Sequence, residues 1–309
     1  MAGQIITQAG PLGPVFKKYI DAVDIITAKK VPDEGLMVVG REINEREQYV
    51  IFLTEKPMGP ATQIPWGQAA PLDTPSQLAI GRWDPVRIGK QWGWDKNVYK
   101  MDIYGMIKSI IPQVIRSHRH GINYECATIN TNGFTSQTAD TMGSGIVAEA
   151  LYSTNHLLAG TGSNAPSVDF AYGPLGIMAG KQNIESQLDP AGQPLMLNGG
   201  VVVSFSVLNS QYGMVNEQTK YLPGTNLNDV NVAQDDTTQH VNHYYSTSST
   251  AWFMRAADDD VHGLARVRQF RLEIDELAQT ANYVQGFTSD ETMIVLWRWW
   301  QGTFGTRGA

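Results

Sequence analysis

Histidines are among the side chains most able to do chemistry, but the spacing of the closest pairs in this sequence does not bring them together. His118 and His120 lie two residues apart in a stretch with helical periodicity, so they point to different sides of a helix. His240 and His243 are three apart in a strand-like stretch, which places them on opposite faces. We therefore predict no shared metal site for either pair, and we expect His118 to be a core or interface residue.

The acidic stretch 258–263 imitates the start of a calcium-binding EF-hand loop. Asp258 and Asp260 stand at alternate positions of this stretch, before His262 and Gly263. The twelfth position of such a loop supplies a bidentate carboxylate, and here that position is Gln269, which has no carboxylate. Calcium binding is therefore not predicted.

Glycine-rich patterns that could hold a nucleotide are incomplete. The pairs Gly89-Lys90 and Gly180-Lys181 lack the glycine that a P-loop has five residues earlier. The stretches 143–148 and 160–165 resemble a relaxed dinucleotide fingerprint, but neither follows an apolar strand. Flexible loops are the better interpretation of both stretches.

Nucleophilic catalysis is not indicated either. No GxSxG sequence occurs, and the one cysteine, Cys126, excludes an intrachain disulfide and a zinc site with paired CxxC ligands. Cys126 sits on the apolar stripe of an expected helix, where a thiol is poorly placed to react. We predict that the chain is not an enzyme, with no catalytic, cofactor-binding or metal-binding residues and no cofactor.

The composition favours a protein that buries much of its surface against neighbours. Charged residues make up 17% of the 309 residues, against about 25% in an average soluble domain. The formal net charge of -7 opposes tight binding along a polyanion, because phosphate neutralisation needs clustered Lys and Arg. We expect contact with nucleic acid to be weak and non-specific.

Membrane insertion and export are not expected. The most apolar stretch, 199–205, is far shorter than the roughly 18 residues that a membrane span needs. The first residues lack the positive charge and long apolar run of a secretory signal. We expect the protein to be made and used in a cytoplasm.

The first fifty residues predict an arm, a helix and strands. Residues 1–14 hold glycines and prolines without periodicity, which predicts an extended arm, and apolar residues recur at helical spacing over 15–30. Apolar runs at 36–40 and 49–55 predict strands, and the charged stretch 41–47 between them predicts a solvated turn or helix.

The next segment, from Lys56 to Gly93, is rich in proline and glycine, and its prolines prevent any continuous helix. Its tryptophans and aliphatic residues normally seek a surface to bury against. We therefore predict a long irregular excursion that packs on something outside itself.

A long helix is predicted from Asp102, as N-cap, to about Asn130, with an apolar stripe and with Pro112 near its middle. At 1.5 Å per residue it would span about 42 Å, which suits an elongated subunit. The glycine-rich stretch 143–174 that follows predicts loops.

A second lobe of mixed type is predicted after this point. A tight turn over 189–195 precedes a strand at 201–205 and a helix to about residue 220. Strands are also predicted at 251–255 and 264–272, and an aromatic strand over 292–300 closes the chain. These elements predict an α+β fold.

Taken in this order, the elements resemble the layout of the major capsid (head) proteins of tailed bacteriophages, which have the Hong Kong 97-type fold. The residue-level likeness is to Mu-like major head subunits. It rests on the run Asp189 to Leu195, the strand Val201 to Val203, the stretch Pro223 to Val232 and the closing Trp297 to Gly305.

The resemblance implies a division of the chain into five parts. They are an N-arm with a first helix (1–30), an extended loop with flanking strands (31–100), a peripheral domain with the long spine helix (101–189), an axial domain (190–285) and a C-terminal strand returning to the body (286–309).

The resemblance also implies self-assembly into an icosahedral shell of hexamers and pentamers that encloses a phage genome in the virion. The implied partners are a portal protein and separate scaffold and decoration proteins, with weak contact to packaged DNA and no membrane. The expected interface residues between subunits are Trp66, Leu72, Leu78, Trp83, Trp92, Trp94 and Phe16.

Two other functions remain open at this point. One is a different virion protein, such as a tail or decoration protein. The other is a hydrolase or carbohydrate-active enzyme, in which the eight tryptophans would supply a sugar platform and an acidic pair would do the chemistry.

Overall fold

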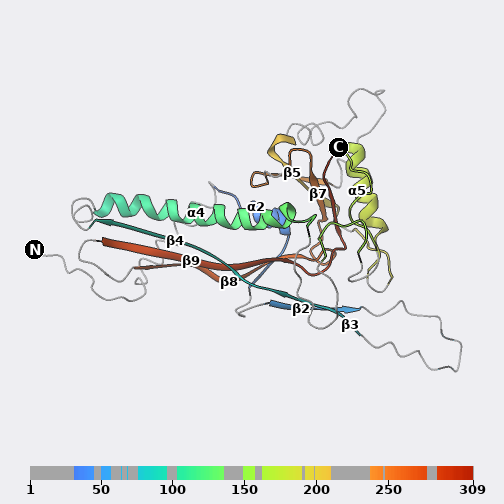
Figure 1. Ribbon diagram of the computed structural model, residues 1–309, viewed down its shortest axis with the longest axis horizontal. Helices are drawn as coiled ribbons and strands as arrows, with labels where there is room; N and C mark the ends of the chain where they lie inside the picture. Colours follow the sequence, from blue (N-terminus) through green and yellow to red (C-terminus); the bar gives the residue numbers. More distant parts are fainter. Residues whose placement is uncertain are drawn as a thin grey trace, which may run out of the picture.

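The computed structural model describes residues 31–44, 50–56, 64, 68, 76–95, 103–135, 149–156, 162–189, 192–197, 199–209, 237–245, 248–276 and 284–308. Two lobes meet near one end of a long helix (Figure 1). In the long lobe this helix lies along a narrow sheet, and the second lobe stands across the end of that sheet.

The long lobe consists of helix α4 (Ile103–Thr131) and a four-stranded sheet with the order β1-β8-β9-β4. The strands are β1 (Glu42–Asn44), β8 (Leu264–Glu276), β9 (Val284–Trp297) and β4 (Val86–Asp95). Strand β1 runs parallel to β8, and the other neighbours are antiparallel. Because β8 and β9 are 13 and 14 residues long, the lobe is elongated.

Helix α4 forms where apolar side chains recur every three or four residues. The described members of this stripe are all buried: Val114, His118, Ile122, Cys126 and Ile129. The long helix predicted from the sequence is thus confirmed, and it contains Pro112 as expected. Its predicted N-cap, Asp102, lies outside the described residues. Among the described residues, no helix combines the length and the apolar character that crossing a bilayer requires.

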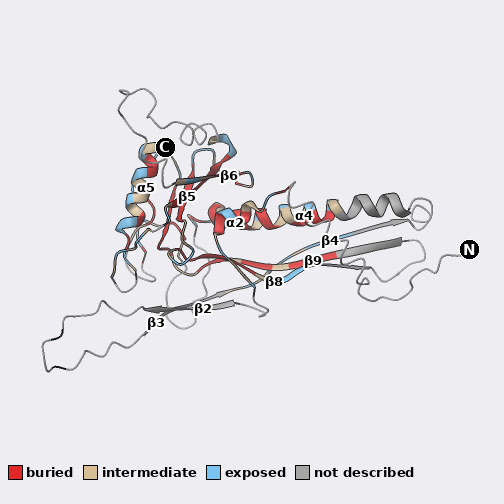
Figure 2. Ribbon diagram, turned by 180° about the vertical axis from the view of Figure 1, so that it is seen from behind, coloured by how far each residue is buried: buried red, intermediate tan, exposed pale blue. Residues whose placement is uncertain are grey.

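The second lobe is a four-stranded sheet of order β10-β7-β5-β6 with helix α5 (Pro174–Ser186) against it. The strands are β10 (Thr303–Thr306), β7 (Trp252–Ala256), β5 (Val201–Ser206) and β6 (Thr237–Asn242). Strand β5 runs parallel to β6 and antiparallel to β7. All six residues of β5 are buried (Figure 2), as expected for an apolar central strand covered on both faces.

A separate two-stranded ribbon pairs β2 (Val50–Lys56) with β3 (Ser76–Trp83) in antiparallel fashion. Only Asp84 and Pro85 separate β3 from β4, so the ribbon continues directly into the edge strand of the long sheet (Figure 1). The proline has no backbone N–H for a ladder hydrogen bond, which suits this change from one sheet to the other.

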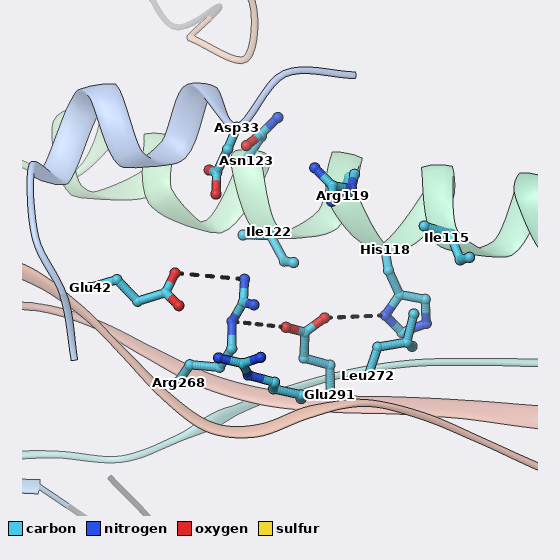
Figure 3. Close-up of a pocket in the computed structure, with 11 residues that line it drawn as sticks. Asp33, Glu42, Ile115, His118, Arg119, Ile122, Asn123, Arg268, Leu272 and Glu291 are labelled. Atoms are coloured by element: carbon cyan, nitrogen blue, oxygen red, sulfur yellow. Dashed lines mark ion pairs between the residues drawn. The ribbon is translucent and has the colours of Figure 1, made fainter. Parts of the chain in front are cut away.

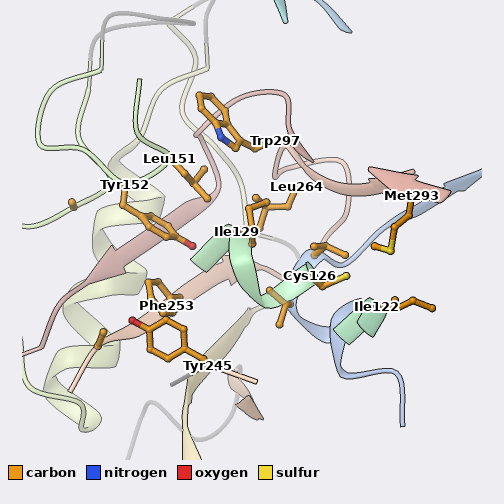
Figure 4. Close-up of a cluster of buried hydrophobic side chains, with 14 residues drawn as sticks. Ile122, Cys126, Ile129, Leu151, Tyr152, Tyr245, Phe253, Leu264, Met293 and Trp297 are labelled. Atoms are coloured by element: carbon orange, nitrogen blue, oxygen red, sulfur yellow. The ribbon is translucent and has the colours of Figure 1, made fainter. Parts of the chain in front are cut away.

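One apolar cluster joins the two lobes (Figure 4). It takes Ile122 and Ile129 from α4, Phe253 from β7, and Met293 and Trp297 from β9. Since β7 belongs to the second sheet and β9 to the first, this shared core fixes one lobe against the other. Another cluster fills the space between α5 and the second sheet.

The apolar run 36–40 is mainly a helix, and the strand predicted there is wrong. Helix α2 (Glu34–Val39) begins after Asp33, whose side chain accepts a hydrogen bond of 3.1 Å from Leu36 N. It ends at Gly40, which has a φ of +79°. A capping aspartate and a glycine in the left-handed region outweigh the strand propensity of two valines. The second predicted strand, 49–55, is confirmed as β2.

The excursion 56–93 is also less irregular than predicted. Strand β3 and most of β4 occupy its second half, where they pair with β2 and β9. Glycines at positions 81, 89 and 93 interrupt the apolar alternation, which is why the sequence pattern did not reveal these strands. In the first half, from residue 57 to 75, only Ile64 and Gln68 are described.

Helix α5 begins at the end of the stretch that predicts loops. Pro174 suits the first turn of a helix, because the N–H that it lacks would have no helical partner there. Gly180 lowers helix propensity, but a Cβ at this position would lie 3.1 Å from both Met254 and Phe304. The glycine therefore lets the helix approach the sheet closely.

The strands predicted at 251–255 and 264–272 are confirmed as β7 and β8, and the strand predicted at 292–300 is confirmed as far as Trp297, where β9 ends. The turn 258–263 does not close a hairpin, because β7 pairs in the second sheet and β8 in the first. The turn after Asp189 is confirmed by a hydrogen bond of 2.9 Å from Gly192 N to Asp189 O. Of the helix predicted to reach residue 220, the structure describes only the 3-10 turn η1 (Val207–Asn209).

Truncation of Ile122 tests the shared core. We expect Ile122→Ala to lower the free energy of unfolding by about 2–5 kcal/mol, because the side chain is buried between the lobes. Tyr124→Ala on the same helix, where the side chain is 60% exposed, should change it by less than about 0.5 kcal/mol. Urea unfolding of both variants checks this, and equal losses would contradict the core described here.

Candidate functional site

A cavity of about 380 Å³ lies between helix α4 and the long sheet (Figure 3). Its lining side chains are Asp33, Glu42, Ile115, His118, Arg119, Ile122, Asn123, Arg268, Arg271, Leu272 and Glu291. The elements bring together three arginines and three carboxylates that are far apart in the sequence. Isoleucines of α4 supply part of its apolar wall.

A chain of ion pairs runs beside this cavity. Arg266 of β8 is 1% exposed, and it donates to both carboxylate oxygens of Asp33, at 2.9 and 2.7 Å, and to Glu42. Arg268 lies 3.8 Å from Glu42 and 3.2 Å from Glu291. The nitrogen nearest Glu291, Nε of Arg268, is not aligned for a hydrogen bond, so this contact is an ion pair alone.

These contacts change the proton affinity of the partners. Burial by itself would raise the pKa of Asp33, but the hydrogen bonds and charge of Arg266 hold that pKa below its usual value. Burial would lower the pKa of Arg266, and the carboxylates of Asp33 and Glu42 raise it instead. The pair of Asp33 and Arg266 is therefore ionised at neutral pH, and the contacts of Arg266 tie the start of α2 and strand β1 to β8.

Ser289, His118 and Glu291 have the composition of a hydrolase triad without its geometry. The Ser289 hydroxyl donates to Lys90 O at 3.0 Å, so its Oγ, 2.7 Å from His118 Nε2, accepts the hydrogen of that nitrogen. A catalytic base must instead take the serine proton at this position. His118 Nδ1 is 3.9 Å from Glu291 Oε2, which is too long for a hydrogen bond.

The surroundings of Ser289 also oppose acyl transfer. The side chain is 2% exposed and lies in the central strand β9, paired with Lys90 of β4 and Ile274 of β8. Its backbone is therefore engaged in ladders on both sides, which leaves no N–H pair to form an oxyanion hole. Burial lowers the pKa of His118, so the ring is neutral at neutral pH. The prediction that His118 is a core residue is confirmed.

The other candidate reactive groups are also placed inside the structure. Cys126 is fully buried on α4, and burial raises its pKa to about 12. The side chain of His262 in the acidic turn points inward, and Asp258 Oδ1 accepts a hydrogen bond from Asp260 N. His240 is buried, whereas His243 is exposed and pairs with Glu34. In the described part of the chain, no cluster of three or more potential ligands is close enough to hold a metal ion.

The interface residues predicted from the sequence are only partly described. Trp83 is half-buried in its own chain, where it meets Trp297 edge to face at 6.1 Å between ring centroids. Leu78 lies in β3, and Trp92 and Trp94 lie in β4. Trp66, Leu72 and Phe16 lie outside the described residues. The role of all seven in subunit contacts therefore stays a prediction.

Other apolar side chains are exposed on the second lobe, and the sequence patterns did not single them out. Leu175 and Met178, three residues apart on α5, are 75% and 45% exposed. Val168, Met196 and Leu208 are 72%, 72% and 73% exposed. Recognising α5 would have revealed the first two, because its inward face already has Ile177 and Ile184.

Replacement of Arg266 tests the ion pairs. We expect Arg266→Met to lower the free energy of unfolding by about 3 kcal/mol. This value is at the lower end of the range for breaking a buried ion pair, because Asp33 and Glu42 keep some access to water. The matched variant Arg87→Met removes an exposed pair with Asp290, and its unfolding midpoint should stay close to that of the wild type. Urea unfolding at pH 7 distinguishes the two expectations.

Buried histidines predict sensitivity to acid. Burial lowers the pKa of His240 to about 4, so between about pH 6.5 and 4 this side chain is protonated in the unfolded chain but not in the folded chain. As the pH falls from about 6.5 to 4, His240 should raise the unfolding equilibrium constant of the wild type by up to tenfold per pH unit. His240→Gln lacks this group, so its unfolding constant should rise less over the same range. Unfolding curves across this range would contradict the expectation if both proteins lost stability equally.

Comparison with known proteins adds a likeness in three dimensions. No family model and no curated protein matches the sequence. The capsid of a native GTA particle matches with a TM-score of 0.57 and 8% identity, over 100% of this chain and 95% of that chain. The capsid of Ralstonia phage GP4 matches with a TM-score of 0.55 and 10% identity, over 88% and 87%.

A crystal structure of a virus-like particle from Pyrococcus furiosus also matches, with a TM-score of 0.54 and 8% identity over 95% of this chain and 100% of that chain. The likeness therefore extends over nearly the full length of both partners. The chain has the α+β fold of these shell subunits, the Hong Kong 97-type fold predicted from its sequence.

Proposed function

We propose that this protein is the major capsid protein of a tailed bacteriophage and assembles into the icosahedral head shell around the genome. The observation that carries the proposal is the match of the chain, end to end, with capsid and virus-like-particle subunits. An elongated long lobe with a second lobe across its end (Figure 1) suits a subunit that tiles a surface.

The division of the chain follows the same proposal. Residues 1–30 are the N-arm, 31–100 the extended loop with its flanking strands, 101–189 the peripheral domain, 190–285 the axial domain and 286–309 the returning strand. In support, the ribbon β2–β3 leaves the body as a separate two-stranded sheet, which an extended loop requires.

Contacts between copies are proposed at two places. The aromatic and aliphatic residues of the extended loop and arm are the first, and Trp66, Leu72, Trp92 and Phe16 are among them. The second is the outer face of α5, where Leu175 and Met178 are exposed. Apolar anchors of this kind give an interface most of its free energy when they are desolvated near its centre.

The partners proposed are copies of the chain in hexamers and pentamers, a portal protein, and separate scaffold and decoration proteins. Contact with packaged DNA is proposed to be weak, because the chain carries a net charge of -7. Assembly in the host cytoplasm and kinship with Mu-like head subunits belong to the same proposal.

A structural function is favoured over a hydrolytic one by the arrangement around Ser289. The serine is buried, its hydrogen is directed away from His118, and the carboxylate of Glu291 is out of hydrogen-bonding reach of the ring. A tail or decoration protein is the remaining alternative, and the near-complete coverage of capsid subunits favours the shell.

Electron microscopy of the purified chain tests the proposal. We expect closed shells or uniform capsomers, because each copy would contact several neighbours. Leu175→Asp should reduce their yield without lowering the unfolding midpoint, since the side chain is 75% exposed, and Gln182→Asp on the same exposed face of α5 should do so less. A chain that stays monomeric under all assembly conditions would contradict a capsid function.

A further inference from the structure

One ring nitrogen of His118 is buried without a hydrogen-bond partner in the described part of the chain. The residue is 2% exposed on helix α4, and its Nε2 lies 2.7 Å from Ser289 Oγ. The other nitrogen, Nδ1, reaches no hydrogen-bonding group of the described residues. Because folded proteins rarely leave a buried polar atom without a hydrogen bond, Nδ1 needs a partner that is not one of these side chains.

The nearest polar atom points to the size of this partner. His118 lines the cavity between α4 and the long sheet, next to Glu291 of β9 (Figure 3). Nδ1 lies 3.9 Å from Oε2 of Glu291, which is too long for a direct hydrogen bond. A water that donates to two acceptors holds them about 4–4.5 Å apart, because each hydrogen bond is about 2.8 Å long. The observed separation is close to this value.

The tautomer of the ring decides which hydrogen the partner must supply. Ser289 gives its own hydrogen to Lys90 O at 3.0 Å, so Nε2 of His118 carries the single hydrogen of the neutral ring. Nδ1 therefore presents a lone pair, and only a donor can pair with it. An anion without hydrogens does not meet this need, and it would also face the carboxylate of Glu291.

The other side of the same carboxylate disfavours a cation. Nε of Arg268 is buried 3.2 Å from Oε1 of Glu291, and it forms no hydrogen bond with a described residue. The guanidinium would repel a second positive charge, and its N–H requires an acceptor. Groups that both donate and accept meet both requirements. Water is the smallest of them, and a cavity of about 380 Å³ has room for several.

We propose that a bound water bridges Nδ1 of His118 and Oε2 of Glu291, and that a further water in the same cavity accepts the Nε hydrogen of Arg268. The bridging water donates one hydrogen to each of its two acceptors, and its own lone pairs accept from neighbouring water. Such a bridge is nearly as favourable in enthalpy as a direct hydrogen bond.

The bridge joins two halves of a polar network that spans the sheet beneath α4. On one side, Lys90 of β4 and Ser289 of β9 hold the imidazole through Nε2. On the other side, Glu291 pairs with Arg268 of β8, which lies 3.8 Å from Glu42 of β1. Ser289 and Glu291 are two residues apart in β9, so their side chains share one face of the sheet. Through the water, all four strands contribute to one network.

A density map of the full-length chain, at a resolution that shows ordered water, is the first test. We expect one peak within hydrogen-bonding distance of both Nδ1 of His118 and Oε2 of Glu291, and a second peak beside Nε of Arg268. A side chain or an ion at the first position, a cavity without density, or direct contact between the two residues would overturn the proposal.

Replacement of His118 tests the bridge in solution. In His118→Asn the side-chain oxygen lies close to the place of Nδ1 and can still accept from the water. In His118→Gln the side-chain nitrogen lies close to the place of Nε2, so the contact with Ser289 is kept and the acceptor of the bridge is lost. The two variants therefore separate the bridge from the packing of the ring.

Glu291→Met removes the second acceptor of the bridge, and it is combined with each variant. Urea unfolding should show that this change raises the unfolding equilibrium constant by about two- to tenfold less in the His118→Gln background than in the wild type, because the bridge is already broken there. In the His118→Asn background the effect should match that in the wild type. Equal effects of Glu291→Met in all three backgrounds would contradict the bridge.

Discussion

The long lobe depends on the full pairing of one buried positive charge. Arg266 is almost completely inaccessible in β8, and a guanidinium in such a place is tolerated only when carboxylates and hydrogen bonds surround it. Asp33 and Glu42 supply them, and they precede Arg266 by 233 and 224 residues. The same pairing therefore places the cap of α2 and the edge strand β1 beside the sheet. Asp33 has two roles, because one of its oxygens also caps α2.

The apolar core extends this constraint to the second lobe. Cys126 lies under α2, close enough that a Cβ at Gly35 would come within 2.7 Å of its sulfur, and the cluster continues to Tyr152 and Phe253, whose rings stack at 5.2 Å. A close-packed core of this kind transmits displacement instead of absorbing it. The shared core thus holds the two lobes in one relative orientation.

Acid acts on this structure through its buried histidines. Burial lowers the pKa of His240 to about 4 and that of His262 to about 3, so these rings oppose folding when acid forces a charge on them. His240 lies in strand β6 of the second sheet, and His262 lies in the turn that connects β7 to β8.

The sequence by itself determined the elements whose signals are local. The stripe through Ile122 and Cys126 indicated α4, the apolar run at 201–205 indicated β5, and the order of elements indicated the fold. Helix α2 was missed because its signals are a cap and a terminal glycine, and α5 because Gly180 is explained only by the sheet that it approaches. Which strands pair with one another was decided by tertiary structure alone. Strands β7 and β8 follow each other in the chain, but they belong to different sheets. The meeting of Arg266 with Asp33, and of His156 with Trp300, was likewise beyond the sequence, because contacts between distant segments leave no periodicity in the chain.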